Sequence, residues 1–204
     1  LTKGRSLATQ LGVKLQAIVA GDKLEGIENQ LFPFGVDTVY KVEDARLYPY
    51  TSLPHSSILI NLFKEIKPQI AFMGATSIGR DLGPRLSARV STGLTADCTK
   101  LEIGEERELL MTRPAFGGNL MATIVCKDHR PQMSTVRPGV MKKMTADANR
   151  KGEIVDYKIN FNEEKISRVR LLKTVKEDIK SKIITPMRQL ALDLSDELIS
   201  VDDK

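Results

Sequence analysis

The sequence predicts an α/β fold with a doubly wound, mainly parallel sheet that is extended by antiparallel strands. Strand-like and helix-like segments alternate up to Val90, which is typical of parallel strands joined by right-handed crossovers. Within this part, a short apolar run leads through a loop of small residues into a helix. After Val90, four extended segments follow one another without a helix between them, which predicts hairpins.

The composition indicates a folded, globular chain. Its 204 residues suffice for a buried core, and 41% of them are hydrophobic and 28% charged. The net charge of +5 is too small to predict a nucleic-acid partner. Every apolar run is shorter than the roughly 18 residues that predict a membrane span. Cys98 and Cys126 have neither CxxC spacing nor a nearby histidine cluster, which predicts reduced thiols, a cytoplasmic location and no metal site.

The chain opens with a helix pattern. Residues 2–12 predict a helix that ends at a glycine C-cap, and residues 14–20 predict the strand that follows. Because a helix leads directly into a buried strand, we expect a further strand ahead of Leu1. Residues 24–34 predict a short helix or turn, and residues 37–43 alternate like a half-exposed strand.

The second helix and the central unit come next. Residues 49–54 interrupt the pattern, and residues 56–66 predict a helix with one apolar side. Residues 69–73 form an apolar run that is too short for a helix and ends in glycine, so they predict a buried strand. The helix after it has Asp81 near its first turn. Pro84 is expected early enough in that helix to cost no hydrogen bond.

The loop 74–79 is a candidate anion site. A strand, a glycine-bearing turn and a helix N-terminus point free N–H groups at an anion, and Thr76, Ser77 and Gly79 are the candidate phosphate ligands. The alternative is a tight β–α turn without a ligand. Since the loop has neither GxGxxG nor a Walker lysine, the turn is the favoured interpretation of this loop alone.

The remaining segments predict the antiparallel extension and a separate tail. Four extended segments come first, with a hairpin turn at 104–107. A loop or surface helix at 141–152 comes next, and two further strand patterns follow it. The extended segments are 93–103, 108–113, 119–126 and 132–136, and the later strands are 153–161 and 166–172. We therefore expect one domain over 1–172 and a helical tail or linker over 173–204, in which residues 187–201 form an amphipathic segment.

Arg113 and Arg137 are the arginines with the clearest functional pattern. Each precedes a proline at the end of an apolar strand, and proline holds the preceding residue extended. Gly117 and Gly118 allow a backbone or a flat ligand to come close. A guanidinium whose position is fixed at a strand end can donate hydrogen bonds to a flavin edge, a phosphate or a carboxylate. The alternative is a structural arginine that donates to loop carbonyls.

Acid–base or nucleophilic chemistry finds little support in the sequence. His55 and His129 lack a recognisable serine, cysteine or aspartate companion, which argues against a triad. His55 is expected at a helix start and His129 in a turn. Asp97 is interpreted as a buried aspartate that caps a neighbouring loop, with a crevice-facing position as the alternative.

Three segments, in this order, resemble the N-terminal domain of the electron-transfer flavoprotein alpha subunit. They are GATSIGRDLGPRLSARVSTGLTADCTKLEI at 74–103, TRPAFGGN at 112–119 and STVRPG at 134–139. The resemblance extends from the first residues to about residue 176 and implies a Rossmann-like domain of the adenine nucleotide alpha hydrolase type. It places Arg113, and less surely Arg137, at the junction with a beta subunit and near its flavin.

The resemblance implies an electron carrier subunit rather than a catalyst. The family pairs with an electron-transfer flavoprotein beta subunit and carries electrons between FAD and an acyl-CoA or other dehydrogenase, or a quinone reductase. This segment would be the scaffold of that heterodimer and would hold no flavin tightly. The family's GGRG-type FAD site does not occur before Lys204, so either the chain is a fragment or the flavin domain is replaced.

Two functions of other classes remain. A free-standing adenine-nucleotide-binding module would use Thr76, Ser77 and Gly79 around a phosphate. An adenylate-transferring enzyme would need a phosphate-gripping motif, which this chain lacks.

Overall fold

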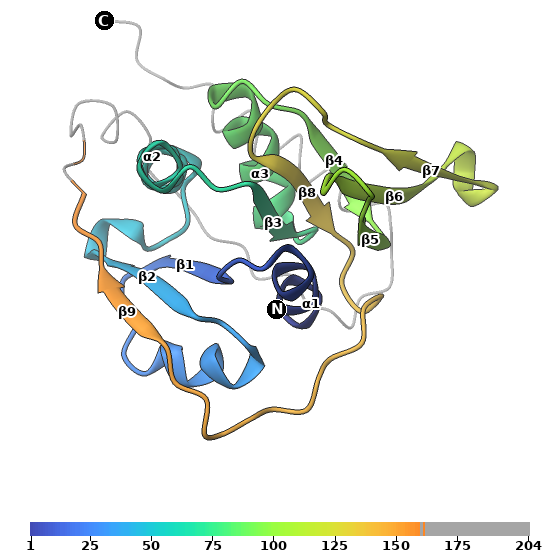
Figure 1. Ribbon diagram of the computed structural model, residues 1–204. Coiled ribbons are helices and arrows are strands. Elements are labelled where there is room, and N and C mark those ends of the chain that lie inside the picture. The colour runs from blue at the N-terminus through green and yellow to red at the C-terminus, as the bar shows by residue number, and fades with distance from the viewer. Residues whose placement is uncertain (160, 162–204) are drawn as a thin grey trace, which may run out of the picture. The chain divides into compact units, whose positions relative to one another are not determined.

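The parallel strands form two three-stranded sheets, and the antiparallel strands form a third. The computed structural model describes residues 1–159 and 161, and Figure 1 shows the three sheets with their helices. The first sheet has the order β1 (Gln16–Gly21), β2 (Thr38–Glu43), β9 (Glu153–Asp156). The second has the order β3 (Ile70–Gly74), β8 (Gln132–Val136), β4 (Leu94–Cys98). The third contains β5 (Lys100–Ile103), β6 (Leu109–Ala115) and β7 (Leu120–Ile124). The predicted α/β class with an antiparallel extension is confirmed.

Three α-helices accompany the sheets in the described part of the chain: α1 (Thr2–Leu11), α2 (Ser52–Ile66) and α3 (Ser77–Arg89). α1 ends as predicted, because Gly12 takes the left-handed conformation with φ 69° and its N–H reaches the last turn. α2 begins four residues earlier than expected. Pro54 lies in its first turn, where a missing N–H is tolerated, so this proline does not interrupt the helix.

α3 begins directly at the loop after β3. Thr76 is its N-cap, and the Thr76 Oγ1 accepts from the Gly79 N–H at 3.2 Å. Since the helix begins at Ser77, Pro84 lies inside it and beyond the first turn. The expectation that Pro84 costs no hydrogen bond is therefore wrong: a residue here would normally donate to the carbonyl of Arg80.

The strands after Val90 divide between two sheets. β4 and β8 both run parallel in the second sheet, with β8 between β3 and β4. The predicted hairpins are therefore confirmed only for β5, β6 and β7. The turn at 104–107 is present, with the Gly104 N–H donating to the Glu108 carbonyl at 2.9 Å. Residues 141–152 form a loop without helix.

The core lies between the sheets and the helices. Leu7 of α1 packs against Leu101, Leu109 and Met111 of the antiparallel sheet. Leu86 of α3 is fully buried with Met133 of β8 and Phe63 of α2. In the part of the chain that is described, no helix is long and apolar enough to cross a membrane. The predicted strand at 166–172, the helical tail and the amphipathic segment at 187–201 lie outside the described residues.

Candidate functional site

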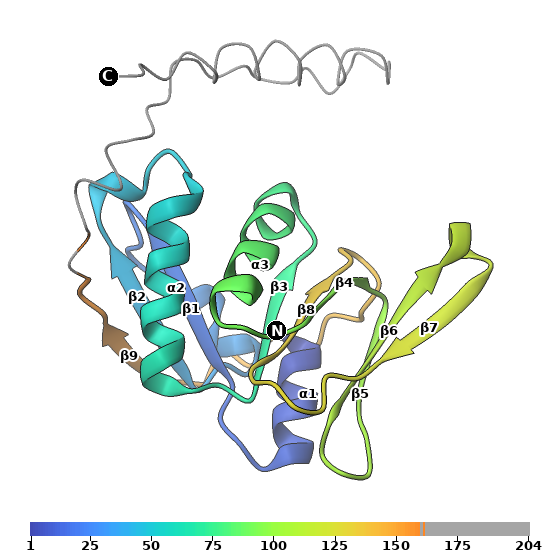
Figure 2. The same cartoon turned by 90° about the horizontal axis from the view of Figure 1, so that it is seen from above.

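The candidate site lies at the carboxyl end of the second parallel sheet. Because β3, β4 and β8 run in the same direction, the residues that follow them meet at one edge. This edge brings together the loop 74–79, Asp97 and Arg137. Figure 2 shows β6 and β7 reaching outward beside it.

Asp97 is the centre of the site. It takes a positive φ of 61° at the irregularity of β4, and its N–H donates to Thr135 Oγ1 at 2.9 Å. Arg137 donates to both carboxylate oxygens, from Nε at 3.1 Å and from Nη2 at 2.6 Å. The Nη2 of Arg80 lies 3.7 Å from Asp97 Oδ1. The interpretation of Asp97 as a buried loop cap is wrong, because the carboxylate is partly exposed and its hydrogen bonds come from an arginine.

The arginines around Asp97 leave the site with a surplus of positive charge. The hydrogen bond from Arg137 is the main reason that the pKa of Asp97 lies below its ordinary value, and the charges of Arg80 and Arg113 add to it against the effect of burial. We define these four residues as the arginine cluster: Arg80, Asp97, Arg113 and Arg137. Three guanidinium groups against one carboxylate give a charge of +2, which suits an anionic ligand.

Arg113 differs from Arg137 in its partners. Its Nε is buried and has no hydrogen-bond partner, and within residues 1–159 and 161 its guanidinium makes neither a hydrogen bond nor an ion pair. Its positive charge lowers the pKa of Asp97 and of Cys98. An unsatisfied buried donor costs free energy, so a ligand that accepts from Arg113 would be favoured there.

Cys98 lies beside the cluster but is not an activated thiol. It is fully buried, and burial raises the pKa of its thiol. Its Sγ donates to the Thr95 carbonyl at 3.4 Å. A neutral, enclosed thiol is a poor nucleophile.

In the loop 74–79, the fold itself explains the residue type at two of the three candidate positions. A Cβ on Gly79 would lie 1.8 Å from the Gly74 carbonyl oxygen, so the close approach of two backbone segments requires glycine. The Thr76 hydroxyl is engaged as the cap of α3. Ser77 is exposed at the helix start. This geometry supports the tight turn, and a phosphate at this loop stays a prediction.

Gly117 and Gly118 lie at the tip of a hairpin rather than in the cluster. They belong to the 3₁₀ turn η4 (Phe116–Gly118) between β6 and β7, with φ angles of 71° and 94° that glycine adopts without strain. Open space surrounds both positions. Phe116 beside them is 82% exposed. We call residues 109–124, which are β6, η4 and β7, the hairpin arm.

The hairpin arm exposes several large apolar side chains. Leu120 and Met121 of β7 are 59% and 57% exposed. β7 is the outer strand of its sheet, so its free edge is also open. Because Leu120 and Met121 are neighbours in a strand, their side chains point to opposite faces of the arm, so apolar side chains are exposed on both faces.

The histidines lie away from the cluster. His55 is in the first turn of α2, where its Nδ1 lies 2.8 Å from the Thr51 carbonyl oxygen and burial lowers the pKa of the ring. His129 lies in a bend, as expected. Among the residues that the structure describes, no group of histidine, cysteine or acidic side chains could hold a metal ion.

Arg80 and the central role of Asp97 were not predicted. Arg80 follows the loop directly, and its Nε donates to the Ala75 carbonyl at 3.0 Å, which directs the side chain back over the loop. The position of Arg80 in the first helical turn after the loop is the sequence signal that could have identified it as a site residue. The partner of Asp97, however, is forty residues away in sequence.

Comparison with known proteins gives a consistent match. Residues 1–161 match the electron transfer flavoprotein domain. The chain is 49% identical to the electron transfer flavoprotein subunit alpha of Thermoanaerobacterium thermosaccharolyticum, over 87% of this chain and 53% of the relative. It is 45% identical to the protein of the same name from Clostridium acetobutylicum, over 96% of this chain and 55% of that relative.

A further relative has a more specific name. The acryloyl-CoA reductase electron transfer subunit beta of Anaerotignum propionicum is 40% identical, over 87% of this chain and 55% of the relative. The chain thus spans about half the length of the curated relatives that it matches. The order of motifs, the parallel βα units and these matches agree, and the chain belongs to the electron transfer flavoprotein domain family.

Proposed function

We propose that this chain is the N-terminal, Rossmann-like part of an electron transfer flavoprotein alpha subunit. In the whole protein it pairs with a beta subunit and serves electron transfer between FAD and an acyl-CoA or other dehydrogenase, or a quinone reductase. The names of its relatives support this proposal. The observation that carries it here is the guanidinium of Arg113, which has no hydrogen-bond partner among the described residues and lies in a cluster of charge +2.

The residues of the cluster fit one edge of a flavin better than a whole flavin. FAD, when bound, would be the group that accepts and releases electrons. Arg113 would donate hydrogen bonds to an anionic or electron-rich edge of it, and the partly exposed Arg137 would hold Asp97 in place. The side chains of Arg80 and Arg137 are largely or partly exposed, so another protein surface would complete the site.

The hairpin arm is the proposed contact with the beta subunit. The strand β6 carries Arg113 and leads to the exposed Phe116, so the arm would fix the arginine relative to the partner. A partner strand could also extend the sheet at the free edge of β7. The aromatic side chain and the two apolar side chains supply the type of surface that forms the centre of a stable interface.

The proposal includes four further statements about the whole protein. The domain ends at about residue 172, and the part that holds FAD lies in the remainder of the alpha subunit. The protein acts as a carrier rather than as a catalyst by itself. A cytoplasmic location is favoured by the two cysteines, which form no disulfide.

The test is the intact mass of the natural protein together with its visible absorption spectrum. A yellow heterodimer, much larger than 22.7 kDa, supports the proposal. A colourless protein of this size contradicts it. For the alternative, a nucleotide-binding module, AMP or ATP at a hundred times its Kd would stabilise the protein by about 2.7 kcal/mol, and a melting curve with either nucleotide detects that shift.

A further inference from the structure

A small polar cavity lies at the amino ends of two strands of the second sheet. It has a volume of about 310 Å³ and is bordered by Gln69 and Ile70 at the start of β3 and by Gln132 at the start of β8. The arginine cluster lies at the opposite, carboxyl ends of these strands. Pockets for small molecules usually have about 300–1,000 Å³. The cavity is therefore separate from the arginine cluster and large enough for a small ligand.

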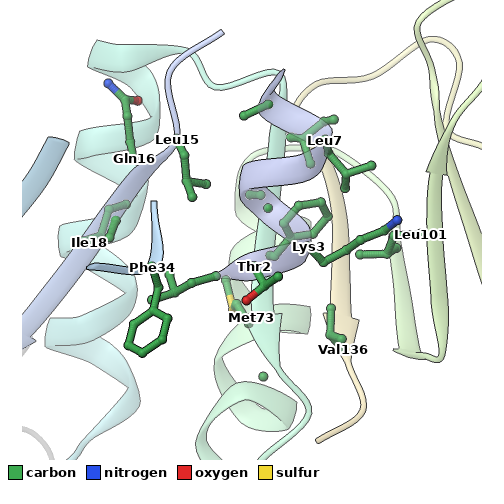
Figure 3. Close-up of a pocket in the computed structure, with 18 of the residues that line it drawn as sticks. Thr2, Lys3, Leu7, Leu15, Gln16, Ile18, Phe34, Met73, Leu101 and Val136 are labelled. Atoms are coloured by element: carbon green, nitrogen blue, oxygen red, sulfur yellow. The ribbon is translucent and has the colours of Figure 1, made fainter. Parts of the chain in front are cut away.

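This cavity differs in chemistry from a larger one beside it. The larger cavity, of about 1410 Å³, lies between β1 and β3, and Figure 3 shows Ile18 and Met73 among its apolar side chains. The smaller cavity shares part of that apolar wall. Its other walls carry charged and amide side chains, which belong to Gln69, Glu106, Arg107, Arg130 and Gln132.

Gln132 places a buried hydrogen-bond donor at the smaller cavity. The residue is 2% exposed, and its Oε1 accepts from the Leu109 N–H at 2.5 Å. Because that bond occupies the oxygen, Nε2 is the end of the amide that remains for another partner. Within residues 1–159 and 161, Nε2 has no hydrogen-bond partner. A buried N–H group without an acceptor costs free energy, so a ligand that accepts from Gln132 is favoured here.

Two guanidinium groups border the same cavity. Arg130 donates from Nε to Gln69 Oε1 at 3.3 Å and from Nη1 to three carbonyls of the loop 126–129. Arg107 donates from Nη2 to the Leu11 carbonyl at 2.6 Å. These bonds hold both groups in place. Among the residues that the structure describes, Arg130 Nη2 and Arg107 Nη1 have no partner, so each group still has donors for a ligand.

Most acceptors on the cavity walls are already engaged, which sets the class of ligand. The Leu11 carbonyl, Gln69 Oε1 and Gln132 Oε1 each accept one of these bonds. The carboxylate of Glu106 is largely exposed and lies 3.8 Å from Lys127 Nζ. Two guanidinium groups against one carboxylate give the walls a charge of +1. The cavity therefore offers free donors and positive charge, which suit a small anion that accepts hydrogen bonds.

We propose that this cavity binds a small organic monocarboxylate. The carboxylate would accept from Gln132 Nε2 and from the two arginines, and an apolar part of a few carbon atoms would lie against Val13 and Ile70. An inorganic anion would leave the apolar side chains uncovered, and a neutral ligand would leave the positive charge unpaired. The residues that carry this site belong neither to the arginine cluster nor to the hairpin arm, so the inference does not depend on the proposed function.

Calorimetric titration of pentanoate into the natural protein tests the inference. A ligand with so few atoms binds weakly, so we expect a Kd on the order of 1 mM or below. Acetate and inorganic phosphate lack the apolar chain, and pentan-1-ol lacks the charge, so each should bind at least about tenfold more weakly. A failure of pentanoate to bind at about 10 mM overturns the inference. Phosphate binding that equals pentanoate binding also overturns it, in favour of a site for inorganic anions.

Two substitutions in the natural protein locate the binding. Arg107→Met removes one charge at an exposed turn residue. Gln132→Glu replaces the free donor by an acceptor and keeps an oxygen for the Leu109 N–H. Each should weaken pentanoate binding at least about tenfold, the loss of one charge-assisted hydrogen bond. Arg107→Lys should recover part of that loss. The control Arg85→Met, at an exposed arginine of α3 outside the cavity, should bind pentanoate as the parent does.

The affinities of these variants decide the inference. Parent-like affinity in Arg107→Met or in Gln132→Glu overturns it, because pentanoate then binds elsewhere. The Tm of each variant without pentanoate reports whether it folds. If Gln132→Glu does not fold, Arg107→Met decides alone, since the exposed Arg107 side chain is not part of the core.

Discussion

Arg113 and Arg137 share a sequence pattern but differ in their surroundings. Both are followed by proline, but Arg113 lies within β6 (Leu109–Ala115), whereas Arg137 directly follows β8 (Gln132–Val136). Arg137 donates to the carboxylate of Asp97, whereas the buried Nε of Arg113 has no partner in the part of the chain that the structure describes. The expectation that each arginine ends its strand is therefore wrong for Arg113, which stays paired with Ala122 of β7, and the neighbouring residues decide whether an arginine is available to a ligand.

Replacing Arg113 by alanine in the proposed heterodimer should lower the reduction potential of the flavin. A charge-assisted hydrogen bond of about 1.5–3 kcal/mol corresponds to roughly 60–130 mV in a one-electron couple. Solvent at the open edge reduces this, so we expect a shift of tens of millivolts. Arg113→Lys should recover part of it, because the charge remains but the planar fork does not.

A potentiometric titration of the flavin absorbance measures this shift. Arg107→Ala is the charge-matched control, because Arg107 lies in the turn between β5 and β6 and donates to the Leu11 carbonyl. An unchanged potential in Arg113→Ala, with subunit affinity retained, would show that Arg113 is structural only.

Asp37 should contribute to stability in a pH-dependent way. It accepts from the Leu15 N–H at 2.7 Å, from Arg5 at 2.6 Å and from Arg150 at 2.8 Å. Burial raises the pKa of Asp37, but the hydrogen bonds more than offset burial and hold that pKa below the ordinary 3.8. A lowered folded-state pKa means that the stabilisation is present above about pH 4 and is lost as the pH falls through the folded-state value.

Asp37→Asn should therefore lower the free energy of unfolding by about 2 kcal/mol at neutral pH. The difference from the parent protein should shrink below pH 4. Urea unfolding at several pH values measures it, with the exposed Asp128→Asn as the control. A difference that stays constant down to pH 2 would contradict the assigned role of the carboxylate.

At the scale of elements, the start of α3 depends on Gly79. The sequence alone predicts that a simple turn tolerates alanine here at a cost of about 1 kcal/mol or less. The structure contradicts this, since an added Cβ would lie 1.8 Å from the Gly74 oxygen. The backbone must shift to relieve that contact.

Gly79→Ala should thus destabilise the protein by about 1–3 kcal/mol or more, which is typical of overpacking. Thermal unfolding with and without AMP measures the stability and the nucleotide response together. Gly93→Ala is the matched control, because its Cβ would meet only Cys126 Sγ at 3.6 Å. A melting point equal to that of the parent would show that the loop relaxes freely.

The hairpin arm should contribute to binding more than to folding. Exposed aromatic and apolar side chains contribute little to monomer stability, whereas in an interface such residues often contribute more than about 1.4 kcal/mol, which is tenfold in Kd. The double substitution Phe116→Ser and Met121→Ser should weaken binding of the beta subunit at least tenfold with little change in Tm.

Titration calorimetry of the two subunits measures that affinity. Tyr48→Ser is the control for loss of an exposed aromatic residue, since Tyr48 is 72% exposed and lies outside the arm. Equal affinity of the double variant and the parent would place the interface elsewhere.

At the scale of the whole molecule, the chain should not hold FAD tightly by itself. The arginine cluster offers one charged edge for a flavin, and the sequence has no GGRG-type loop. The 204-residue chain, mixed with excess FAD and desalted, should be colourless. Recovery of flavin absorbance at one equivalent would show that the site is complete in this chain.

The sequence by itself determined the local elements and the family. The helix end at Gly12, the turn at 104–107 and the change of pattern after Val90 depend on residues that are neighbours in the chain. Glycine conformations and hydrophobic periodicity are local properties, so they are visible without a structure. The three motifs that indicate the family are local in the same sense.

Only the tertiary structure decided which strands pair and which side chains meet. β8 inserts between β3 and β4, and this long-range pairing brings Arg137 to Asp97. The surroundings of Arg113, whose Nε has no partner among the described residues, also depend on segments that pack from elsewhere. Pairing energies are similar for many apolar strands, so composition does not select among them. Register and burial in the assembled sheets make that choice.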